Sequence, residues 1–565
     1  MAEAGGSGGG GSDLEWVGDA AIAIPVAGQA GSARTTAAVR SLAEAIRSAA
    51  FPGVVDIVPS PERVTVCYDL AAVSQLDTLV ATLAAVARDA AAAPPPQQAK
   101  VHEIPVRYGG DAGPDLEDVC QACHIDRTTL IRRHTETDYL VTAVGFTPGF
   151  TYLGGLDATL AVPRRATPRT QVPAGSVGIG GSQTGVYPCA SPGGWHIIGH
   201  TTATFFDPQA DPPALCRVGD TVRFVETGER GPALSPRFGP QVFPSPATRR
   251  RTGRPGITVV APGLLTTVQD LGRPGFRASG VTQGGAADPV AAAVANLLVG
   301  NPPESAVLEL TLAGPTLRFE SDCRIALTGA AFPGLPSWRP LELPAGTTIT
   351  LGHATRGCRG YLAVAGGIDV PEVLGSRSTH LAAGFGGFAG RALQAGDRLA
   401  MGDACSPPTD SHWSLSPSLL PLPSQPQTLR LILPDAQPLA SATRLLGPAY
   451  RVSSQSNRMG LRLAGPPIEQ SGDGRSRAVL PGTVQLPPDG QPILLLTDSQ
   501  TIGGYPVLGH VASADLRLAA QLRPGDGLVF SAVSRAEAHA AWQHQQSLLA
   551  DIEERITARW SQRLP

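Results

Sequence analysis

Three short motifs occur in the first half of this chain and again, in the same order, in the second half. The longest is Gly-Gly-Trp-His-Ile-Ile-Gly-His at 193–200, which corresponds to Gly-Gly-Tyr-Pro-Val-Leu-Gly-His at 503–510. A turn with proline and glycine precedes it in each half, and a Gly-Asp turn with an alternating strand follows it. Three matches in one order indicate a duplicated all-β unit, which we expect to be a barrel. The flanking pairs are 172–177 with 480–484, and 218–224 with 524–530.

Glycine and proline are frequent throughout the chain. The 565 residues include 66 glycines and 53 prolines, which favours short strands joined by turns over helix bundles. A chain of this length normally forms several domains. Before residue 95, two Ala- and Leu-rich helical segments alternate with strand-like segments, which predicts a small α+β subdomain in an otherwise mainly β protein with tandem β-barrels. The expected segments are a flexible tail (1–12), the α+β subdomain (13–95), a first barrel (100–228), a linker (229–255), a β-rich part (256–403), a second barrel (426–533) and a C-terminal helix (535–562).

Lys100 is the only lysine in the sequence. It does not end a Gly-rich loop, so a P-loop nucleotide site is excluded. The same shortage argues against a lysine Schiff base and against a biotinylated carrier lysine. The net charge is −3, with acidic and basic residues interspersed, so no sustained positive field for nucleic acid is expected. The basic run at 249–254 lies among prolines and glycines and is typical of a solvated linker.

Eight cysteines are scattered along the chain. No apolar segment approaches the roughly 18 residues of a membrane span, and the amino terminus lacks the apolar core of a secretory signal. We therefore expect a cytoplasmic protein with reduced thiols and no membrane partner. Cys-Gln-Ala-Cys-His at 120–124 matches the pattern that attaches c-type haem. Haem attachment normally needs export, so we interpret these cysteines as small apolar residues of a helix, with a redox pair as the alternative.

In the first half, glycines flank aromatic residues at 145–155, which lets backbone amides approach a ligand closely. Three arginines between prolines follow, and guanidinium groups suit phosphate and carboxylate. Turn chemistry and solvated arginines explain the same pattern equally well. The residues in question are Phe150, Tyr152, Arg164, Arg165 and Arg169.

Three histidines of the first half, His134, His196 and His200, are candidate acid or base groups because imidazole titrates near neutral pH. A single histidine is more often structural than catalytic. The sequence leaves both interpretations open.

In the second half, Asp288 precedes a helical segment and is a good N-cap, so a purely structural role and a binding role are equally open. Glu309 alternates with leucines on a strand and projects to the opposite face from them. The short segments 456–460 and 497–501 carry amide, guanidinium and carboxylate groups that could orient an amide substrate and stabilise an oxyanion. No Ser/His/Asp arrangement of a hydrolase triad accompanies them.

Long motifs give both halves a resemblance to one known family. Residues 13–228 contain His-x-Ile-Pro-Val-x-Tyr-Gly-Gly at 102, Gly-Phe-x-Pro-Gly-Phe-x-Tyr-Leu at 145 and Ser-Pro-Gly-Gly-Trp at 191. They resemble the B subunit of the bacterial ATP-dependent 5-oxoprolinase, the KipI group. Residues 256–533 contain Gln-Asp-Leu-Gly-Arg, Gly-Ser-Arg-Ser-Thr at 375, Ser-Asn-Arg-Met-Gly at 456 and Gly-Gly-Tyr-Pro at 503, and resemble its C subunit, the KipA group.

The resemblance implies tandem cyclophilin-like β-barrels and the ATP-dependent opening of the lactam 5-oxo-L-proline to L-glutamate. Phosphorylation of the lactam oxygen would turn an inert amide into an activated imidate that water attacks. The family uses ATP and Mg²⁺ and requires a separate LamB/YcsF-type A subunit, so we expect this chain to bind that partner. A homo-oligomer is a further possibility.

The residues expected at the site follow from these patterns and from the resemblance. The predicted catalytic residues are His200, Asn457, Arg458 and Asp498. The predicted substrate- or ATP-binding residues are His134, Phe150, Tyr152, Arg164, Arg165, Arg169, Arg273, Asp288, Glu309, Arg377 and Tyr505, with no protein metal ligands.

Two departures from the family pattern bear on this site. The family's C subunits usually have a carboxylate near the position of Arg477, which lies here in Gly-Arg-Ser-Arg-Ala at 474–478. Its B subunits more often have arginine at the position of His200. Either difference could alter phosphate handling or substrate choice.

Two other functions compete with the 5-oxoprolinase role. A carboxyltransferase like that of urea amidolyase shares the same two modules, although no biotinyl lysine is found in the sequence. Some KipI-group proteins instead inhibit a sensor histidine kinase, which would make the first half a binding module. The sequence favours the 5-oxoprolinase role over both.

Overall fold

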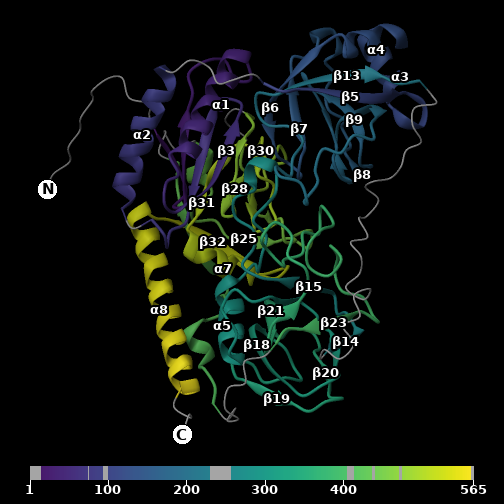
Figure 1. The fold of residues 1–565 in the computed structure, drawn as a ribbon. Coiled ribbons are helices and arrows are strands. Elements are labelled where there is room, and N and C mark those ends of the chain that lie inside the picture. Colours follow the sequence, from purple (N-terminus) through teal and green to yellow (C-terminus); the bar gives the residue numbers. More distant parts are fainter. Residues whose placement is uncertain are drawn as a thin grey trace, which may run out of the picture.

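The computed structural model describes residues 14–73, 75–92, 99–228, 256–403, 413–434, 440–469 and 474–561. The predicted tail, the predicted linker and the basic run within that linker lie outside the described residues. Strands dominate the described part, which confirms the mainly β class. Figure 1 shows an α+β unit and a barrel at one end, β-sheets at the other, and a second barrel between them.

The N-terminal unit is an antiparallel sheet of order β1-β2-β4-β3 with two helices packed on it. Helix α1 begins after Ser32, whose hydroxyl oxygen accepts a hydrogen bond from the Thr35 N–H. Its apolar residues Val39, Leu42 and Ile46 recur at helical spacing and are buried against the sheet. The elements are β1 (Glu15–Val17), β2 (Ala21–Pro25), α1 (Ala33–Ser48), β3 (Val54–Ser60), β4 (Arg63–Tyr68) and α2 (Leu76–Ala92).

The next unit is a closed barrel of order β10-β7-β6-β13-β5-β12-β9. The parallel pair β5 and β13 joins its first and last strands, and all other pairs in it are antiparallel. Cys120 is buried in the barrel core, and Cys123 packs against it. The strands are β5 (Val101–Tyr108), β6 (Asp138–Val144), β7 (Thr151–Gly154), β9 (Ser176–Gly180), β10 (Gln183–Val186), β12 (His196–His200) and β13 (Thr221–Glu226); α3 (Leu116–Cys123), α4 (Arg127–Thr135) and the pair β8 (Arg169–Val172) and β11 (Ser191–Gly193) accompany them.

The second barrel has the order β24-β31-β28-β29-β26-β25-β32 and repeats the first barrel strand for strand. It too is joined by a parallel pair of first and last strands, β24 and β32, and it too carries a two-stranded ribbon, β27 with β30. The duplication predicted from the three repeated motifs is therefore confirmed. The strands are β24 (Gln427–Ile432), β25 (Tyr450–Val452), β26 (Gly460–Ala464), β27 (Arg477–Ala478), β28 (Thr483–Gln485), β29 (Ile493–Leu495), β30 (Ile502–Gly503), β31 (Val507–Val511) and β32 (Gly527–Ala532).

Between the barrels in sequence lie two five-stranded sheets, β20-β17-β14-β23-β22 and β15-β16-β21-β18-β19, which share one apolar core. Helix α5 packs on β18 and β21 and is buried from Val290 to Val299. Helix α8 covers the outer side of α5 with Ile552 and Ile556 (Figure 1). The elements are β14 (Gly256–Ala261), β15 (Leu265–Gln269), α5 (Pro289–Val299), β16 (Val307–Thr311), β17 (Thr316–Phe319), β18 (Cys323–Ala331), β19 (Leu341–Leu343), β20 (Thr348–Thr350), β21 (Arg356–Val364), β22 (Ile368–Asp369), β23 (Arg398–Met401) and α8 (Arg535–Ser561).

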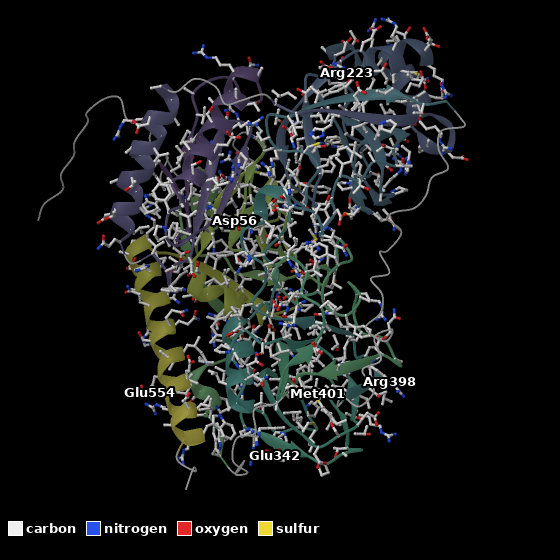
Figure 2. The ribbon with its side chains drawn as sticks, viewed as in Figure 1. Asp56, Arg223, Glu342, Arg398, Met401 and Glu554 are labelled. Carbon is white, nitrogen blue, oxygen red and sulfur yellow. The ribbon has the colours of Figure 1, made fainter. Side chains whose placement is uncertain are left out.

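Residues 271–288, called the junction segment below, connect β15 to α5 and contact every other unit. Asp56 on β3 accepts hydrogen bonds from the N–H groups of Gly275 (3.1 Å) and Arg277 (2.8 Å). The Arg277 guanidinium in turn donates to the carbonyl of Val479, beside the second barrel. In Figure 2, Asp56 lies where the N-terminal sheet borders the C-terminal half. The N-terminal sheet therefore holds a loop that belongs to the other half.

Both barrels dock on the same junction segment. In the first barrel, the Gly149 N–H donates to the Ser279 carbonyl at 2.9 Å. In the second, the hydroxyl of Thr497 donates to the Gly284 carbonyl at 2.7 Å. The loop between β6 and β7 and the loop after β29 thus hold the segment at Ser279 and Gly284, which fixes the two halves relative to each other.

Candidate functional site

A buried ion-pair network lies where the junction segment, β16 and the second barrel meet. Arg458, at the turn before β26, is 4% exposed. Its Nε and Nη2 donate to the two oxygens of Asp498 at 2.7 and 2.9 Å, Nη1 donates to Glu309, and Nη2 also donates to the Gly285 carbonyl at 2.7 Å. Burial alone would lower the pKa of Arg458, but the two carboxylates raise it well above its usual value. Arg458 therefore stays charged and holds both carboxylates in place.

Glu309 forms the floor of this network and is 1% exposed. Its Oε2 accepts hydrogen bonds from the Ala287 N–H (2.9 Å) and the Tyr361 hydroxyl (3.0 Å), while Oε1 faces Arg458 and lies 3.8 Å from Arg359 Nε. Both carboxylate oxygens are thus engaged inside the protein. Through these contacts, Glu309 positions the guanidinium group of Arg458.

Asp288 caps α5, as its position before the helix predicted. Its Oδ1 accepts from the Ala291 N–H (3.1 Å), and Oδ2 accepts from Gln521 Nε2 (2.9 Å). Gln521 also accepts from the N–H groups of Cys358 and Arg359, so it ties the second barrel to β21. Burial raises the pKa of Asp288, against smaller effects of Arg517 and these hydrogen bonds. The carboxylate is enclosed by protein groups.

Arg273 lies at the start of the junction segment and is 1% exposed. Its Nη2 donates to the Ser378 carbonyl, Nε donates to the Val373 carbonyl at 3.4 Å, and the guanidinium lies 5.0 Å from the centre of the Phe385 ring. Its Nη1 is buried and has no hydrogen-bond partner among the described residues. Burial lowers the pKa of Arg273 to about 10, with Asp270 and Asp498 opposing the shift. A buried guanidinium N–H without an acceptor lowers the stability of the fold, unless a ligand oxygen accepts its hydrogen bond.

Gly284 leaves open the space that Arg273 faces. Its φ is +62°, and a Cβ on it would lie 3.5 Å from Arg273 Nη1 and 3.9 Å from Asp498 Oδ1. The side chain of Asp498 is 12% exposed, whereas that of Arg458 is 3% exposed. The gap beside Gly284 therefore presents an N–H donor on one side and a carboxylate acceptor on the other. That pair matches the carbonyl and the N–H of an amide.

His380 belongs to the same cluster, although no sequence pattern singled it out. It is buried, it stacks on Phe385 with ring centres 4.9 Å apart, and its Nδ1 accepts from the Ala383 N–H. Burial lowers the pKa of His380 to about 4, with Asp498 raising it and Arg273 lowering it further. The imidazole is therefore neutral at pH 7 and carries its proton on Nε2. The only sequence signal was its place directly after Gly-Ser-Arg-Ser-Thr.

Three other predicted residues of the second half lie at the surface. Arg377 pairs with Glu372 at 2.7 Å and donates to the Val370 carbonyl, and its own N–H donates to Asp270. Asn457 is exposed and accepts from the Met459 N–H within its turn. Tyr505 is 40% exposed. Across the described ranges, none of the three side chains forms a hydrogen bond or an ion pair with the buried network.

In the first barrel, the predicted arginines converge on a carboxylate of their own. Asp115 accepts from both terminal nitrogens of Arg169 (2.7 and 2.8 Å), from Arg165 (3.1 Å) and from the Ile197 N–H (2.7 Å). Burial would raise the pKa of Asp115, but Arg169 and these hydrogen bonds lower it overall. Arg164 is exposed and makes no such pair with any described residue. Of the three arginines, Arg164 is therefore the one available to meet a ligand.

His134 is a core residue of the first barrel. It is 0% exposed, its Nδ1 faces the Tyr108 hydroxyl at 2.7 Å, and its Nε2 faces Thr184 Oγ1 at 3.0 Å. Burial lowers the pKa of His134 to about 3, so it is neutral at pH 7. Phe150 and Tyr152 pack with Tyr187 and Trp195 in a buried aromatic cluster.

His200, predicted to be catalytic, lies at the end of β12. Its Nε2 faces the Ala174 carbonyl at 2.9 Å, and burial followed by Arg107 lowers its pKa. These contacts lie within the first barrel, so the structure does not join His200 to Asp498 through any described contact. His196 likewise faces the Pro163 carbonyl of the first barrel.

Family models match both halves of the chain. The carboxyltransferase domain, subdomain C and D, matches residues 12–216, and the carboxyltransferase domain, subdomain A and B, matches residues 279–532. The chain belongs to this family.

Curated relatives match each half separately. The C subunit of 5-oxoprolinase from Escherichia coli (strain K12) is 40% identical over 53% of this chain and 98% of that protein. The B subunit of 5-oxoprolinase from Bacillus subtilis (strain 168) is 39% identical over 38% of this chain and 93% of that protein. The crystal structure of TTHA0988 matches with a TM-score of 0.77 at 34% identity, over 90% of this chain and 99% of that one. The chain is therefore a B-like and a C-like module in one polypeptide.

Membrane spans and metal clusters are both missing from the described residues. None of their helices combines the length and the apolar character needed to cross a membrane. They also contain no group of three or more His, Cys, Asp or Glu placed to hold a metal ion.

Proposed function

We propose that this chain is the fused B and C component of an ATP-dependent 5-oxoprolinase, which opens the lactam of 5-oxo-L-proline to give L-glutamate. The match of each half to a component of that enzyme supports the proposal. The observation that carries it is the unpartnered Arg273 Nη1 opposite Asp498, across the space that Gly284 leaves open. A lactam offers an oxygen to the first and an N–H to the second.

The roles follow from the contacts. Asp498 accepts the lactam N–H, and the two hydrogen bonds from Arg458 fix the orientation of its carboxylate. Arg273 Nη1 donates to the lactam oxygen and stabilises negative charge that develops there. His380, neutral and protonated on Nε2, supplies a further donor close to this cluster. Glu309 and Asp288 support this arrangement through Arg458 and Gln521 and contact no substrate.

ATP, when bound, supplies the phosphoryl group that turns the lactam oxygen into a leaving group. Arg273 is suited to bind the charged oxygens of that phosphoryl group, because its Nη1 is buried and has no hydrogen-bond partner among the described residues. The described residues contain no carboxylate cluster for a metal, so Mg²⁺ would be held mainly by phosphate oxygens and water. Since the relatives are components of one enzyme, we expect a LamB/YcsF-type A subunit as the partner that completes the site.

The test is reconstitution of the chain with such an A subunit, followed by the release of ADP with and without 5-oxoproline. We expect release that depends on 5-oxoproline, and a loss of about 100-fold or more in Arg273→Gln, the size of one removed oxyanion donor. Arg318→Gln is the matched control, since that exposed arginine pairs with Glu320 at 3.7 Å and belongs to no predicted site. ADP release that ignores 5-oxoproline, or an equal loss in both variants, would contradict the proposal.

A second function is favoured by the family description itself, which names a carboxyltransferase domain for both halves. The same Arg273–Asp498 gap would then bind the amide group of a urea-like acceptor. Carboxyl transfer from an externally supplied carboxybiotin carrier to urea would support this alternative. Its absence, together with turnover of 5-oxoproline, would exclude it.

A further inference from the structure

A cavity of about 290 Å³ lies where three parts of the chain meet, away from the network around Arg458. One wall is the C-terminal half of α1, the second is the loop at 211–218 before β13, and the third is the part of the junction segment at 275–279. The cavity thus exists only because the B-like and C-like modules are packed together.

Two exposed arginines on this cavity make no ion pair among the described residues, although Glu44 and Asp211 also line it. The side chains of Arg47 on α1 and Arg217 on the loop before β13 both line it, and within the described ranges neither side chain makes a hydrogen bond or an ion pair. Partial burial, and then the charge of Arg217, lower the pKa of Arg47, while Glu44 offsets part of this. Arg40, by contrast, is satisfied by Glu44 at 3.0 Å and Asp220 at 3.7 Å.

A structural role explains one of these arginines and not the other. Arg47 lies in the last turn of α1, where the helix dipole favours a cation. Arg217 lies on a loop and lines the same cavity, so two like charges share one site, which an anion would stabilise. Guanidinium groups that converge from two elements form a common site for carboxylate and phosphate.

The remaining walls limit the size of the occupant. Pro59, Pro212 and Pro213 are stiff, and Phe276 and Ser279 are also among the residues that line the cavity. Ser279 adds a hydroxyl that can donate to an anion. A compact molecule with one oxyanion group and a short apolar body fits these surroundings.

We propose that this cavity binds the carboxylate or phosphate group of a small metabolite between Arg47 and Arg217. The bound metabolite contacts the junction segment at 275–279, just after Arg273, so binding also stiffens the loop that carries that residue. The site is separate from the Arg273–Asp498 gap and stands whether or not the chain acts on 5-oxoproline.

The test is calorimetric titration of the whole chain, without ATP or an A subunit, with two probes: inorganic phosphate and L-glutamate. The variants are Arg47→Gln, Arg217→Gln and the double variant. The matched control is Arg34→Gln, an exposed arginine in the first turn of α1 that does not line the cavity. Thermal melts of every variant establish that each is folded.

We expect at least one probe to bind, its affinity to fall about tenfold or more in the double variant, and Arg34→Gln to stay within about twofold of the parent chain. Competition between the probes would identify one shared site, and the tighter probe would identify the chemical source. Binding of equal strength in the double variant would place the anion elsewhere and overturn the proposal. So would an equal loss in Arg34→Gln, or no binding of either probe.

Discussion

Glu309 shows how a single buried carboxylate can control the candidate site. It is enclosed with Arg458 and accepts two further hydrogen bonds, from Ala287 and Tyr361. Because a buried charge that loses its partner cannot be solvated, breaking such a pair typically costs about 3–5 kcal/mol. We expect Glu309→Gln to lower the free energy of unfolding by this amount.

Urea denaturation of Glu309→Gln measures this loss, and Glu136→Gln is the control. Glu136 also pairs with an arginine, Arg132 at 2.9 Å, but both side chains are more than half exposed. An exposed pair on a helix contributes about 0.5 kcal/mol or less. Equal losses in the two variants would show that Glu309 is not the support of Arg458 that its contacts indicate.

His134 predicts a pH dependence of stability at the same scale. Its pKa is about 3 in the folded chain and 6.5 in an ordinary environment, because burial disfavours the imidazolium. The folded state is therefore fully favoured above pH 6.5 and loses stability as pH falls towards 3, since the unfolded chain takes up the proton first. Between pH 7 and pH 5 this histidine should account for a loss of about 2 kcal/mol.

Replacing His134 by glutamine isolates that contribution, because glutamine can donate and accept hydrogen bonds but does not titrate. The measurement is urea denaturation at pH 7 and pH 5. The parent chain should lose about 2 kcal/mol more than His134→Gln over this interval. His380 and His510, whose pKa values burial lowers to about 4, add losses common to both proteins. Parallel losses would contradict the assignment of His134 as a buried neutral group.

At the scale of elements, the junction segment controls the geometry of the site. It carries Arg273 and Gly284, and it is held at Gly275 and Arg277 by the carboxylate of Asp56. Burial raises the pKa of Asp56, while Arg277 and the two backbone hydrogen bonds lower it. Since Asp56 belongs to the B-like module, that module orders a loop of the C-like module.

Asp56→Ala should therefore loosen the junction segment. We expect amide hydrogen exchange at 272–280 to rise by about tenfold or more, which corresponds to about 1.4 kcal/mol of lost local protection. Asp69→Ala is the control, because Asp69 caps the Ala71 N–H in an exposed turn of the same unit. Exchange that stays unchanged in Asp56→Ala would show that the second barrel alone holds the segment.

The sequence predicted these elements unevenly, for a physical reason. Turns and alternating strands are set by neighbouring residues, so three repeated motifs sufficed to predict two related barrels. The partners of Arg458 are set by tertiary packing, because Glu309 lies 149 residues away in the chain. Spacing could place Arg458 and Asp498 in short glycine-bounded segments, but it could not select His380 or separate Arg273 from the surface pair of Arg377 and Glu372.

At the scale of the whole molecule, the fusion keeps the B-like and C-like modules in equal number and holds the interface between them together. Both barrels, the N-terminal sheet and the two central sheets all contact the junction segment, and a shared apolar cluster joins Phe150 and Trp195 of the first barrel to Ile502 of the second. In separate subunits these surfaces would have to find each other by diffusion. One polypeptide raises their effective concentration and keeps Arg273 in register with Asp498.

The proposed chemistry of the whole molecule is activation of a lactam oxygen by phosphorylation. The most direct measurement uses 5-oxo-L-proline labelled with ¹⁸O at the lactam carbonyl, incubated with the chain, an A-type partner and ATP. Water adds to the ring carbon of the phosphorylated lactam and the ring C–N bond breaks, which leaves γ-glutamyl phosphate with the labelled oxygen between carbon and phosphorus. A second water attacks the acyl carbon and displaces the phosphate, so we predict ¹⁸O in the released inorganic phosphate. Label that stays entirely in the side-chain carboxylate of glutamate would contradict this mechanism.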